Sequence, residues 1–582
     1  MTSSRGAGLR SALALVPGAT ALAAPFRAVL ARVRLSRAKH PSLQGHARLA
    51  RRLAKLIRFY EYDEQRFFSS DDAPAAEAGA RRAAFDELAM RLERRAPRTI
   101  ALGDGLESAL SDLAFTKTYR VPFQYARRVK ARLKTGSFVS ASTGVQVVDL
   151  DGNADYDLTG SYGTNVFGYD FYKECIRAGV EHVNALGPVL GSYHPVVREN
   201  VRRLREISGM DEVSFHMSGT EAVMQAVQLA RYHTGRTHAV RFCGAYHGWW
   251  DGVQPGVGNP RAVPDVYTLR DMDDRTLRVL ESRRDIACVL VNPLQALHPN
   301  SGAPSDATLL GSARRAGFDR ARYTAWLHEL RAVCRARSIA LVLDEVFLGF
   351  RIAYGGAQEY FGVEADLVTY GKTLGGGLPV GVLCGKRRFM RRFNDDRPTD
   401  ICFARGTFNS HPYVMGAMNE FLRRIDDPVH RESYRSLDET WNCRAASLNA
   451  RLVTAGLPVR VTNLSSVWTI GYLTPSRYNW MFQFYLQAEG LALSWVGTGR
   501  LIFSHNYSDH DFDAVADRFV AAARRMRDGR WWWSPPGLTD KDITRRVLRE
   551  MVAARLLPWL RPSRGVTADD RVEDLAPEQM DG

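Results

Sequence analysis

Short apolar runs alternate with longer amphipathic segments through the middle of this chain. Unbroken apolar runs, such as those within Ile286–Val291, Ile339–Asp344 and Asp366–Tyr370, are typical of strands buried on both faces of a sheet. Segments with apolar residues at helical spacing lie between them, including one that starts at Ser218 and one over Arg320–Arg337. Strands that alternate with helices predict an α/β fold with a mainly parallel central sheet.

Both flanks of this region depart from the pattern. Residues 459–504 are mixed, with strand-like runs at the two ends, and a helix with an acidic start is expected over Asp509–Arg527. This combination predicts a smaller α+β domain. Upstream of about Phe115, helical spacing predominates, with helices expected over His46–Tyr60 and Ala80–Arg95. The chain is therefore expected to carry an extra helical N-terminal region.

Positive charge is concentrated at the amino-terminal end. The net charge is +16, and residues 1–60 contain twelve Lys or Arg and no Asp or Glu. No recognisable nucleic-acid-binding module accompanies this charge, so we expect no nucleic acid partner. The Ala/Leu-rich run Ser11–Ala31 is interrupted by Pro17, Pro25 and Arg27, which argues against a membrane-spanning helix. Two interpretations stay open: a basic leader, or an amphipathic anchor on a membrane surface.

The cysteines argue for a reducing compartment. There are seven of them, an odd number, and they are scattered without a CxxC pair. This pattern favours reduced thiols over a disulfide framework or a zinc site. We therefore predict a cytoplasmic protein without a bound metal, peripheral to the membrane if the basic end is an anchor.

A lysine and an aspartate stand at the ends of two predicted strands. Asp344 ends one apolar run, and Lys372 follows the run that ends at Tyr370, just before a glycine-rich turn. Ligands of parallel α/β sheets sit at the carboxyl ends of the strands, so both side chains are expected in one site. A lysine amine that loses its proton can form a Schiff base, and an aspartate can hold a cationic ring nitrogen. The pair predicts a pyridoxal phosphate (PLP) enzyme.

Three further motifs supply contacts that such a cofactor needs. Ser218-Gly219-Thr220 lies between a strand and a helix, where free backbone N–H groups and two hydroxyls form a phosphate cradle. Tyr246, followed by His247, comes after the next strand and can stack on a pyridine ring, with Val346 on the opposite ring face. Taken alone, Ser218-Gly219-Thr220 also fits an ordinary helix cap, and Tyr246 also fits an aromatic residue packed in a loop. The segment Asp344-Glu345-Val346 also fits an acidic turn. Only their combination points to a cofactor.

In combination, these motifs resemble the class III aminotransferases of PLP fold type I, especially the glutamate-1-semialdehyde aminomutase branch. The resemblance covers about Val147–Arg527. It rests on Asp151-Gly152-Asn153, Gly160-Ser161-Tyr162-Gly163, Met217-Ser218-Gly219-Thr220-Glu221-Ala222, Tyr246-His247-Gly248, the stretch from Asp344-Glu345-Val346 to Arg351, the stretch from Gly371-Lys372-Thr373 to Gly381, and Gly406-Thr407-Phe408.

The resemblance implies a role for each of these positions. Lys372 would be the Schiff-base lysine and then the general acid/base, and Asp344 would stabilise the pyridinium. Gly219 and Thr220 would hold the phosphate, together with Thr407 reaching from the neighbouring subunit. A homodimer with sites at its interface is implied, as are small amine or amino-acid substrates.

The resemblance also implies a division of the chain. The fold would be the PLP-dependent transferase fold type I, with a large domain, a smaller α+β domain and the helical N-terminal region. The regions are a basic helical extension (1–114), the N-terminal part of the small domain (115–200), the large PLP-binding domain (201–405), the C-terminal small domain (406–528) and a tail with a basic amphipathic helix (529–582).

Departures from the family pattern fall where substrate is expected. Asn292 stands where the family usually has an acidic residue, so a negative charge is replaced by a neutral hydrogen-bonding group. The segment 294–318 is longer than expected. No arginine that would clamp a substrate carboxylate is evident in 137–143, and Asn409-Ser410-His411-Pro412 replaces another family motif. The cofactor motifs are intact, and the substrate motifs are not.

We therefore predict a class III aminotransferase that moves an amino group through a Lys372 Schiff base. Two alternatives use the same cofactor: an intramolecular aminomutase reaction, and carbon–carbon bond formation with an acyl thioester. A fourth reading, a binding protein without catalytic activity, conflicts with the intact Lys372, Asp344 and phosphate loop.

The basic ends also suggest a partner. The segments 44–60 and Asp540–Leu560 are basic and amphipathic, and Trp531-Trp532-Trp533 precedes the second of them. They are candidates for docking an acidic carrier protein or an anionic membrane surface. Helical extensions packed on the enzyme's own dimer are the competing interpretation.

Overall fold

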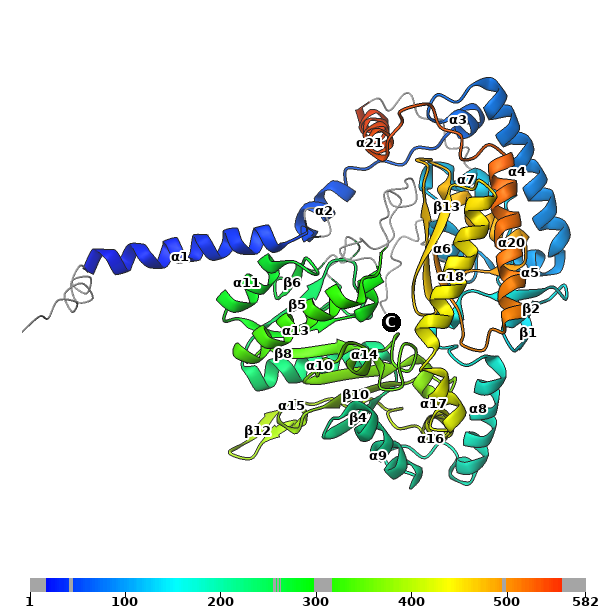
Figure 1. Ribbon diagram of the computed structural model, residues 1–582. Helices are drawn as coiled ribbons and strands as arrows, with labels where there is room; N and C mark the ends of the chain where they lie inside the picture. Colours follow the sequence, from blue (N-terminus) through cyan, green and yellow to red (C-terminus); the bar gives the residue numbers. More distant parts are fainter. Residues whose placement is uncertain are drawn as a thin grey trace, which may run out of the picture.

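A seven-stranded sheet forms the framework of the molecule (Figure 1). The computed structural model describes residues 17–40, 45–254, 258, 261, 263–297, 317–494 and 499–556. The strand order is β4-β10-β9-β8-β7-β5-β6, and all neighbours are parallel except the pairs that β10 makes with β4 and β9. The strands are β4 (Glu212–His216), β5 (His238–Phe242), β6 (Val266–Leu269), β7 (Ile286–Val291), β8 (Ala340–Asp344), β9 (Leu367–Gly371) and β10 (Gly381–Gly385).

Successive residues of the central strands face two different layers of helices. In β7, Leu290 packs in the cluster formed with α10, whereas Val289 and Val291 pack in the cluster that contains α13. Every residue of β7, β8, β9 and β10 is buried, as expected for strands covered on both faces. The prediction of an α/β fold with a mainly parallel sheet is confirmed.

The helices and short elements around this sheet complete the larger part of the molecule. They are α8 (Tyr169–Val183), η3 (Asn184–Leu186), α9 (Val196–Ser208), α10 (Gly219–Thr234), α11 (Asp274–Ser282), η4 (Pro293–Leu297), α13 (Arg320–Ala336), α14 (Gly356–Phe361), η5 (Lys372–Gly375), α15 (Arg387–Met390), β11 (Phe393–Asn394), β12 (Arg397–Ile401), α16 (Pro412–Ile425) and α17 (Pro428–Ser433).

A second core is built from segments on both sides of the large sheet in sequence, and this part of the molecule contains two small sheets. One has the order β1-β2-β3-β15 and the other the order β13-β14-β16. Their elements and the adjoining helices are β1 (Val139–Thr143), β2 (Gln146–Asp149), β3 (Ala154–Asp157), η2 (Gly160–Gly163), α18 (Leu437–Thr454), β13 (Val459–Leu464), β14 (Val467–Tyr472), η6 (Asn479–Met481), α19 (Phe482–Ala488), β15 (Leu491–Ala492), β16 (Arg500–Ile502) and α20 (Asp509–Asp528).

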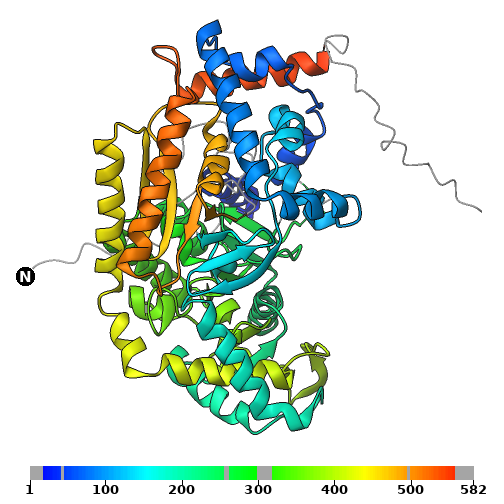
Figure 2. The ribbon, with the colours of Figure 1, turned by 90° about the vertical axis from the view of Figure 1, so that its right-hand side faces the viewer.

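The helical N-terminal region shares this second core. Its helices are α3 (Glu64–Ser69), α4 (Ala75–Arg95), α5 (Pro97–Leu106), α6 (Ser111–Tyr119) and α7 (Phe123–Arg132). Phe67, Phe68 and Tyr125 belong to the same buried cluster as Tyr478 and Trp531. Figure 2 shows α4 running beside α20. The extension is thus an integral part of the fold and not a separate module.

Two of the three tryptophans in the run Trp531-Trp532-Trp533 are buried in this core. Trp531 and Trp532 are buried, and their indole N–H groups donate to Tyr485 Oη at 2.8 Å and to Asn479 Oδ1 at 3.0 Å. The Trp533 backbone oxygen accepts a hydrogen bond from Arg81 at 3.1 Å. The hypothesis that Trp531-Trp532-Trp533 contacts a carrier protein or a bilayer is therefore wrong for Trp531 and Trp532, because the aromatic cluster beneath α4 already covers them.

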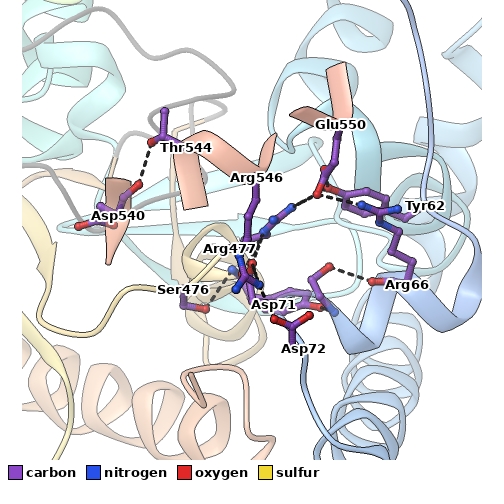
Figure 3. Close-up of polar contacts among 12 residues, drawn as sticks. Tyr62, Arg66, Asp71, Asp72, Ser476, Arg477, Asp540, Thr544, Arg546 and Glu550 are labelled. Atoms are coloured by element: carbon purple, nitrogen blue, oxygen red, sulfur yellow. Dashed lines mark hydrogen bonds and ion pairs between the residues drawn. The ribbon is translucent and has the colours of Figure 1, made fainter. Parts of the chain in front are cut away.

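A buried ion cluster fixes the last described helix, α21 (Asp540–Leu556), to the rest of the fold (Figure 3). Arg477 Nε lies 2.8 and 2.9 Å from the two carboxylate oxygens of Asp71, and Arg477 Nη1 lies 2.9 Å from Glu550 Oε1. Tyr62 donates a short hydrogen bond to Glu550. The cluster thus joins the N-terminal region, the second core and α21 at one point.

Two helices precede α3 in the chain and extend away from the large sheet. They are α1 (Pro17–Ala38), which contacts α11 and projects from the body in Figure 1, and α2 (Ala47–Ala54). The helix expected over His46–Tyr60 is shorter than predicted, because Phe59 and Tyr60 leave helical geometry to pack against Phe123.

No helix within the described ranges is long and apolar enough to cross a membrane. The predicted end of α21 at Leu560 lies outside the described residues, as do residues 298–316 of the long segment 294–318.

Candidate functional site

Lys372 follows the carboxyl end of β9 in a strained, enclosed position. Its φ is 48°, in the left-handed region that a side chain rarely adopts. Its amine lies 5.9 Å from the centroid of the Phe347 ring, and a Cβ at Gly163 would come within 3.3 Å of Lys372 Cδ. Burial lowers the pKa of the Lys372 amine, because desolvation disfavours the ammonium form; Asp344 opposes this shift and Arg351 adds to it.

Asp344 ends β8 and is held by three donors. Its Oδ1 accepts from the Val346 N–H at 3.2 Å and from Thr369 Oγ1 at 3.2 Å, and its Oδ2 lies 2.8 Å from His247 Nδ1. Because an ionised carboxylate only accepts, Nδ1 of His247 carries the proton in this contact. Asp344 is 3% exposed and the His247 side chain is fully buried, so the carboxylate has a fixed orientation.

The start of α10 supplies the candidate phosphate cradle. Ser218 is the N-cap residue, and its Oγ accepts from the Glu221 N–H at 3.3 Å. A helix start leaves further N–H groups without partners inside the helix, which suits an anion. Gly219 is required here, because a Cβ would lie 2.6 Å from a methyl group of Val346. The backbone thus approaches Val346 closely at the point where the cradle opens.

The other predicted residues meet around this cradle. A Cβ at Gly248 would lie 2.6 Å from Thr220 Oγ1, so the turn after His247 packs directly on the cradle. Val346 is half-buried and also adjoins Gly371, the residue before Lys372. Tyr246 is 59% exposed, which leaves a ring face accessible for stacking. The structure therefore brings Ser218, Gly219, Thr220, His247, Asp344, Val346 and Lys372 into one neighbourhood, with Tyr246 at its edge.

Thr407 is not part of this neighbourhood within one chain. It lies in the exposed segment between β12 and α16 and makes no hydrogen bond to the residues above in the part of the chain that the structure describes. Its predicted contact requires a second subunit and stays a prediction.

Several residues that hold the site had no role assigned to them from the sequence, although Phe347 and Arg351 lie in the stretch that carries the family resemblance. Thr369 pairs with Asp344 in the parallel register of β8 and β9, which brings its hydroxyl to the carboxylate. A polar residue inside an otherwise apolar run was the available signal. Phe347 encloses the lysine amine. Arg351, fully buried, donates to the Gly163 and Asn165 backbone oxygens at 3.3 and 2.9 Å and thereby fixes the loop over Lys372.

Comparison with known proteins agrees with this geometry. Residues 128–522 match the model of the family described as aminotransferase class-III. A glutamate-1-semialdehyde 2,1-aminomutase of Citrifermentans bemidjiense is 31% identical over 373 residues, which are 60% of this chain and 81% of that protein. The corresponding protein of Geotalea daltonii is 29% identical over 415 residues, 67% of this chain and 90% of its own length.

Solved structures show the same architecture. A crystal structure of an omega-transaminase from Sphaerobacter thermophilus superposes with a TM-score of 0.59 at 26% identity, covering 74% of this chain and 98% of that one. A glutamate-1-semialdehyde aminomutase from Pseudomonas aeruginosa has a TM-score of 0.61 at 17% identity over 77% of this chain and 99% of that one, which is a likeness of fold.

Proposed function

Because this chain belongs to the class-III aminotransferase family, whose enzymes depend on PLP, we propose that it transfers an amino group from an amine or amino acid to a carbonyl acceptor, with Lys372 as the central catalytic residue. The observation that carries the proposal is the half-buried Lys372, whose amine has a pKa lowered by desolvation, in one site with the buried Asp344 carboxylate. A neutral amine is both the nucleophile and the base that this chemistry needs.

The residues of the site fit PLP. A buried carboxylate that accepts from three donors is suited to a protonated ring nitrogen, and a helix start with two hydroxyls is suited to a phosphate. When bound, PLP withdraws electrons from the carbon that carries the amino group, which makes the proton on that carbon acidic.

Each residue of the candidate site then has a defined task. The Lys372 amine takes up the proton released at the substrate carbon and returns it. Asp344 keeps a positive charge on the ring nitrogen, and His247 orients Asp344. Ser218, Gly219 and Thr220 hold the phosphate, while Tyr246 and Val346 enclose the ring between them. Phe347 excludes water from the amine.

A homodimer would complete the site. Thr407 and its neighbour Phe408 are exposed in the single chain, and Phe408 is 52% exposed although it is a large apolar residue. Residues of this kind are expected at a subunit interface. We propose that Thr407 of one subunit contacts the phosphate bound by the other.

The intramolecular aminomutase reaction is the second candidate, supported by the names of the relatives at about 30% identity. The requirement for an acceptor distinguishes the two. In transamination, one equivalent of keto product forms per site, and repeated turnover then requires a second, different keto compound, because the cofactor stays in its amino form until that acceptor is supplied. In an intramolecular shift of the amino group, one substrate suffices for repeated turnover. A screen of amine donors, each measured with and without a keto acid, tests the proposal; turnover with one substrate alone would replace it by the aminomutase reaction.

The basic end offers a separate contact surface, for which we propose an anionic bilayer. Leu49, Leu53, Leu56, Ile57 and Phe59 are exposed although they are large and apolar, and Leu548, Val552 and Leu556 of α21 are exposed as well. Arg555 donates to the Leu56 backbone oxygen at 3.2 Å, which joins the two segments. Because residues 1–60 contain no acidic residue, charge repulsion disfavours two copies meeting through this surface.

Vesicle co-sedimentation tests this surface. Binding is expected to vesicles with about one-third anionic lipid and to be lost in the double variant Leu53→Glu, Ile57→Glu, because the apolar contact and the positive surface both decrease. Equal binding to neutral vesicles, or no binding to either, would reject the bilayer as the partner.

A further inference from the structure

A buried tyrosine hydroxyl on α8 contacts both the turn that carries Lys372 and the loop over it. Tyr172 Oη lies 2.5 Å from Oγ1 of Thr373, the residue that follows Lys372. The same Oη accepts a hydrogen bond from the Val166 N–H at 2.9 Å. Tyr172, Val166 and Thr373 are all buried. One oxygen atom therefore joins α8, the loop and the lysine turn.

The hydroxyl of Tyr172 is used as an acceptor and as a donor. A backbone N–H can only donate, so Oη accepts from Val166. Burial raises the pKa of Tyr172 to about 12, so the phenol keeps its proton at neutral pH and can donate it to Thr373 Oγ1. Among the described residues, Thr373 Oγ1 has no other hydrogen-bond partner. The orientation of the Thr373 side chain therefore depends on Tyr172.

The turn after β9 needs this support because its backbone is strained. Lys372 has a φ of 48°, and such a conformation persists only where the surrounding structure enforces it. Two glycines let neighbouring helices approach the turn closely. A Cβ at Gly377 would lie 3.4 Å from Tyr172 Cβ on α8, and a Cβ at Gly376 would collide with the Ala417 backbone oxygen on α16. The turn is thus held between α8 and α16.

The hydrogen bond adds a direction that apolar packing does not supply. It acts one residue away from Lys372, and a hydrogen bond weakens steeply when its angle departs from linear. A general base must lie within about 2.6–3.2 Å of the proton that it takes up. Because the lysine side chain is long, a small rotation of its backbone produces a larger displacement of the amine.

We propose that Tyr172 is a positioning residue for Lys372 and acts through Thr373. This role rests on the proposed function of Lys372 and extends it to a residue on another helix. Arg351 holds the same loop through the backbone oxygens of Gly163 and Asn165. The loop over the site and the lysine turn are thereby kept in one relative arrangement, with the Tyr172 hydroxyl between them.

The pH dependence of Lys372 acetylation in the apoenzyme tests this role without any turnover. Tyr172→Phe removes one oxygen and leaves the ring beside Phe171 and Phe421. Without the hydrogen bond the turn can relax and the amine gains contact with water, so the midpoint of labelling should rise toward 10.5. In the PLP-loaded enzyme, kcat should fall by up to about 10²-fold, as displacement by about 1 Å can cause. The KM for the amine donor should change little.

Tyr478→Phe, in the second core, is the matched control. Tyr478 is buried, and its Oη also accepts from a backbone N–H, that of Ser70 at 3.3 Å. It donates to the Phe67 backbone oxygen at 2.6 Å. Loss of the hydroxyl should therefore lower the thermal unfolding temperature in both variants. Only Tyr172→Phe should move the midpoint of Lys372.

The other side of the hydrogen bond supplies a second set of variants. Thr373→Val removes the hydroxyl and keeps the shape of the side chain, so it should move the Lys372 midpoint as Tyr172→Phe does. Thr373→Ser keeps the hydroxyl and should retain the wild-type midpoint. The double variant Tyr172→Phe, Thr373→Val should shift the midpoint no further than either single change, because both changes remove the same interaction.

Failure of this role and failure of the proposed function give different results. An unchanged Lys372 midpoint in Tyr172→Phe, or an equal shift in Tyr478→Phe, would overturn the positioning role even if Lys372→Ala abolishes turnover. A shift in Tyr172→Phe together with full turnover in Lys372→Ala would keep the positioning of the amine and reject its catalytic role. Additive shifts in the double variant would overturn the assignment of the effect to Thr373.

Discussion

The side-chain amide of Asn292 donates to the Tyr246 backbone oxygen at 3.0 Å. On its other side, Asn292 Oδ1 accepts from the Leu294 N–H at 3.2 Å. An acidic residue, which the family pattern leads one to expect, accepts but cannot donate when ionised. Asparagine at this position therefore satisfies both a backbone carbonyl and a backbone N–H, and it fixes the loop that carries Tyr246 and His247.

Replacing Asn292 by aspartate should consequently destabilise this loop. The change is nearly isosteric, but it sets a carboxylate against the Tyr246 carbonyl in a position that is 8% exposed. A loss of about 1–3 kcal/mol in the free energy of unfolding is expected, with weaker retention of PLP. Urea unfolding of the PLP-loaded enzyme measures both. Asn394→Asp is the control, because among the described residues Asn394 uses only its acceptor oxygen, toward the Asp396 N–H; an equal effect of the two changes would contradict this account.

Removal of the Lys372 amine should abolish turnover without unfolding the protein. Lys372→Ala deletes the group that accepts and returns the proton, and a loss of general acid/base catalysis of about 10²–10⁴-fold is the least that is expected. Borohydride treatment followed by peptide mapping should place the reduced cofactor on Lys372 in the wild type and on no residue in the variant. Label on another lysine would remove Lys372 from its proposed role.

Burial of Lys372 predicts an unusual pH dependence of its reactivity. Because the pKa is lowered from 10.5, the neutral amine becomes abundant at a lower pH than for an exposed lysine. Competitive acetylation of the apoenzyme should therefore label Lys372 half-maximally below pH 10.5. Phe347→Ala admits water beside the amine and should raise the midpoint toward 10.5. Phe393→Ala, at an exposed site, should leave it unchanged; a Lys372 midpoint at or above pH 10.5 would show that burial does not lower its pKa.

The candidate site could be predicted from the sequence because its parts lie at strand ends. Asp344 and Lys372 each follow a continuous apolar run, and the parallel order of β8 and β9 brings the ends of such runs together. The local sequence was thus sufficient to predict that Asp344 and Lys372 lie in one site. It did not reveal Thr369 or Asn292 as supporting residues, since their partners depend on strand register and on a loop 46 residues away.

Contacts between distant segments account for what the sequence did not predict. Trp531-Trp532-Trp533 has the composition of a docking surface, but the residues that bury Trp531 include Phe68 and Tyr478, which are far away in the chain. Phe59 and Tyr60 continue a helical pattern, yet their packing on Phe123 ends the helix early. Periodicity describes which side of a segment is apolar and does not identify the surface that will cover it.

The same long-range packing predicts that Arg477→Met strongly destabilises the protein, because the change would break the ion cluster in Figure 3. Arg477 is 3% exposed, and its removal leaves Asp71, 7% exposed, to Arg546 at 3.6 Å and Glu550, 13% exposed, to Arg66 at 2.9 Å. Removing one partner of a buried ion pair typically costs about 3–5 kcal/mol. Limited proteolysis should then release α21 at protease concentrations that leave the wild type intact. Arg545→Met removes a charge from the same helix, where Arg545 is 71% exposed and lies 3.8 Å from Asp542, and a change below about 1 kcal/mol is expected. If both variants resist proteolysis as the wild type does, the cluster does not hold α21 in place.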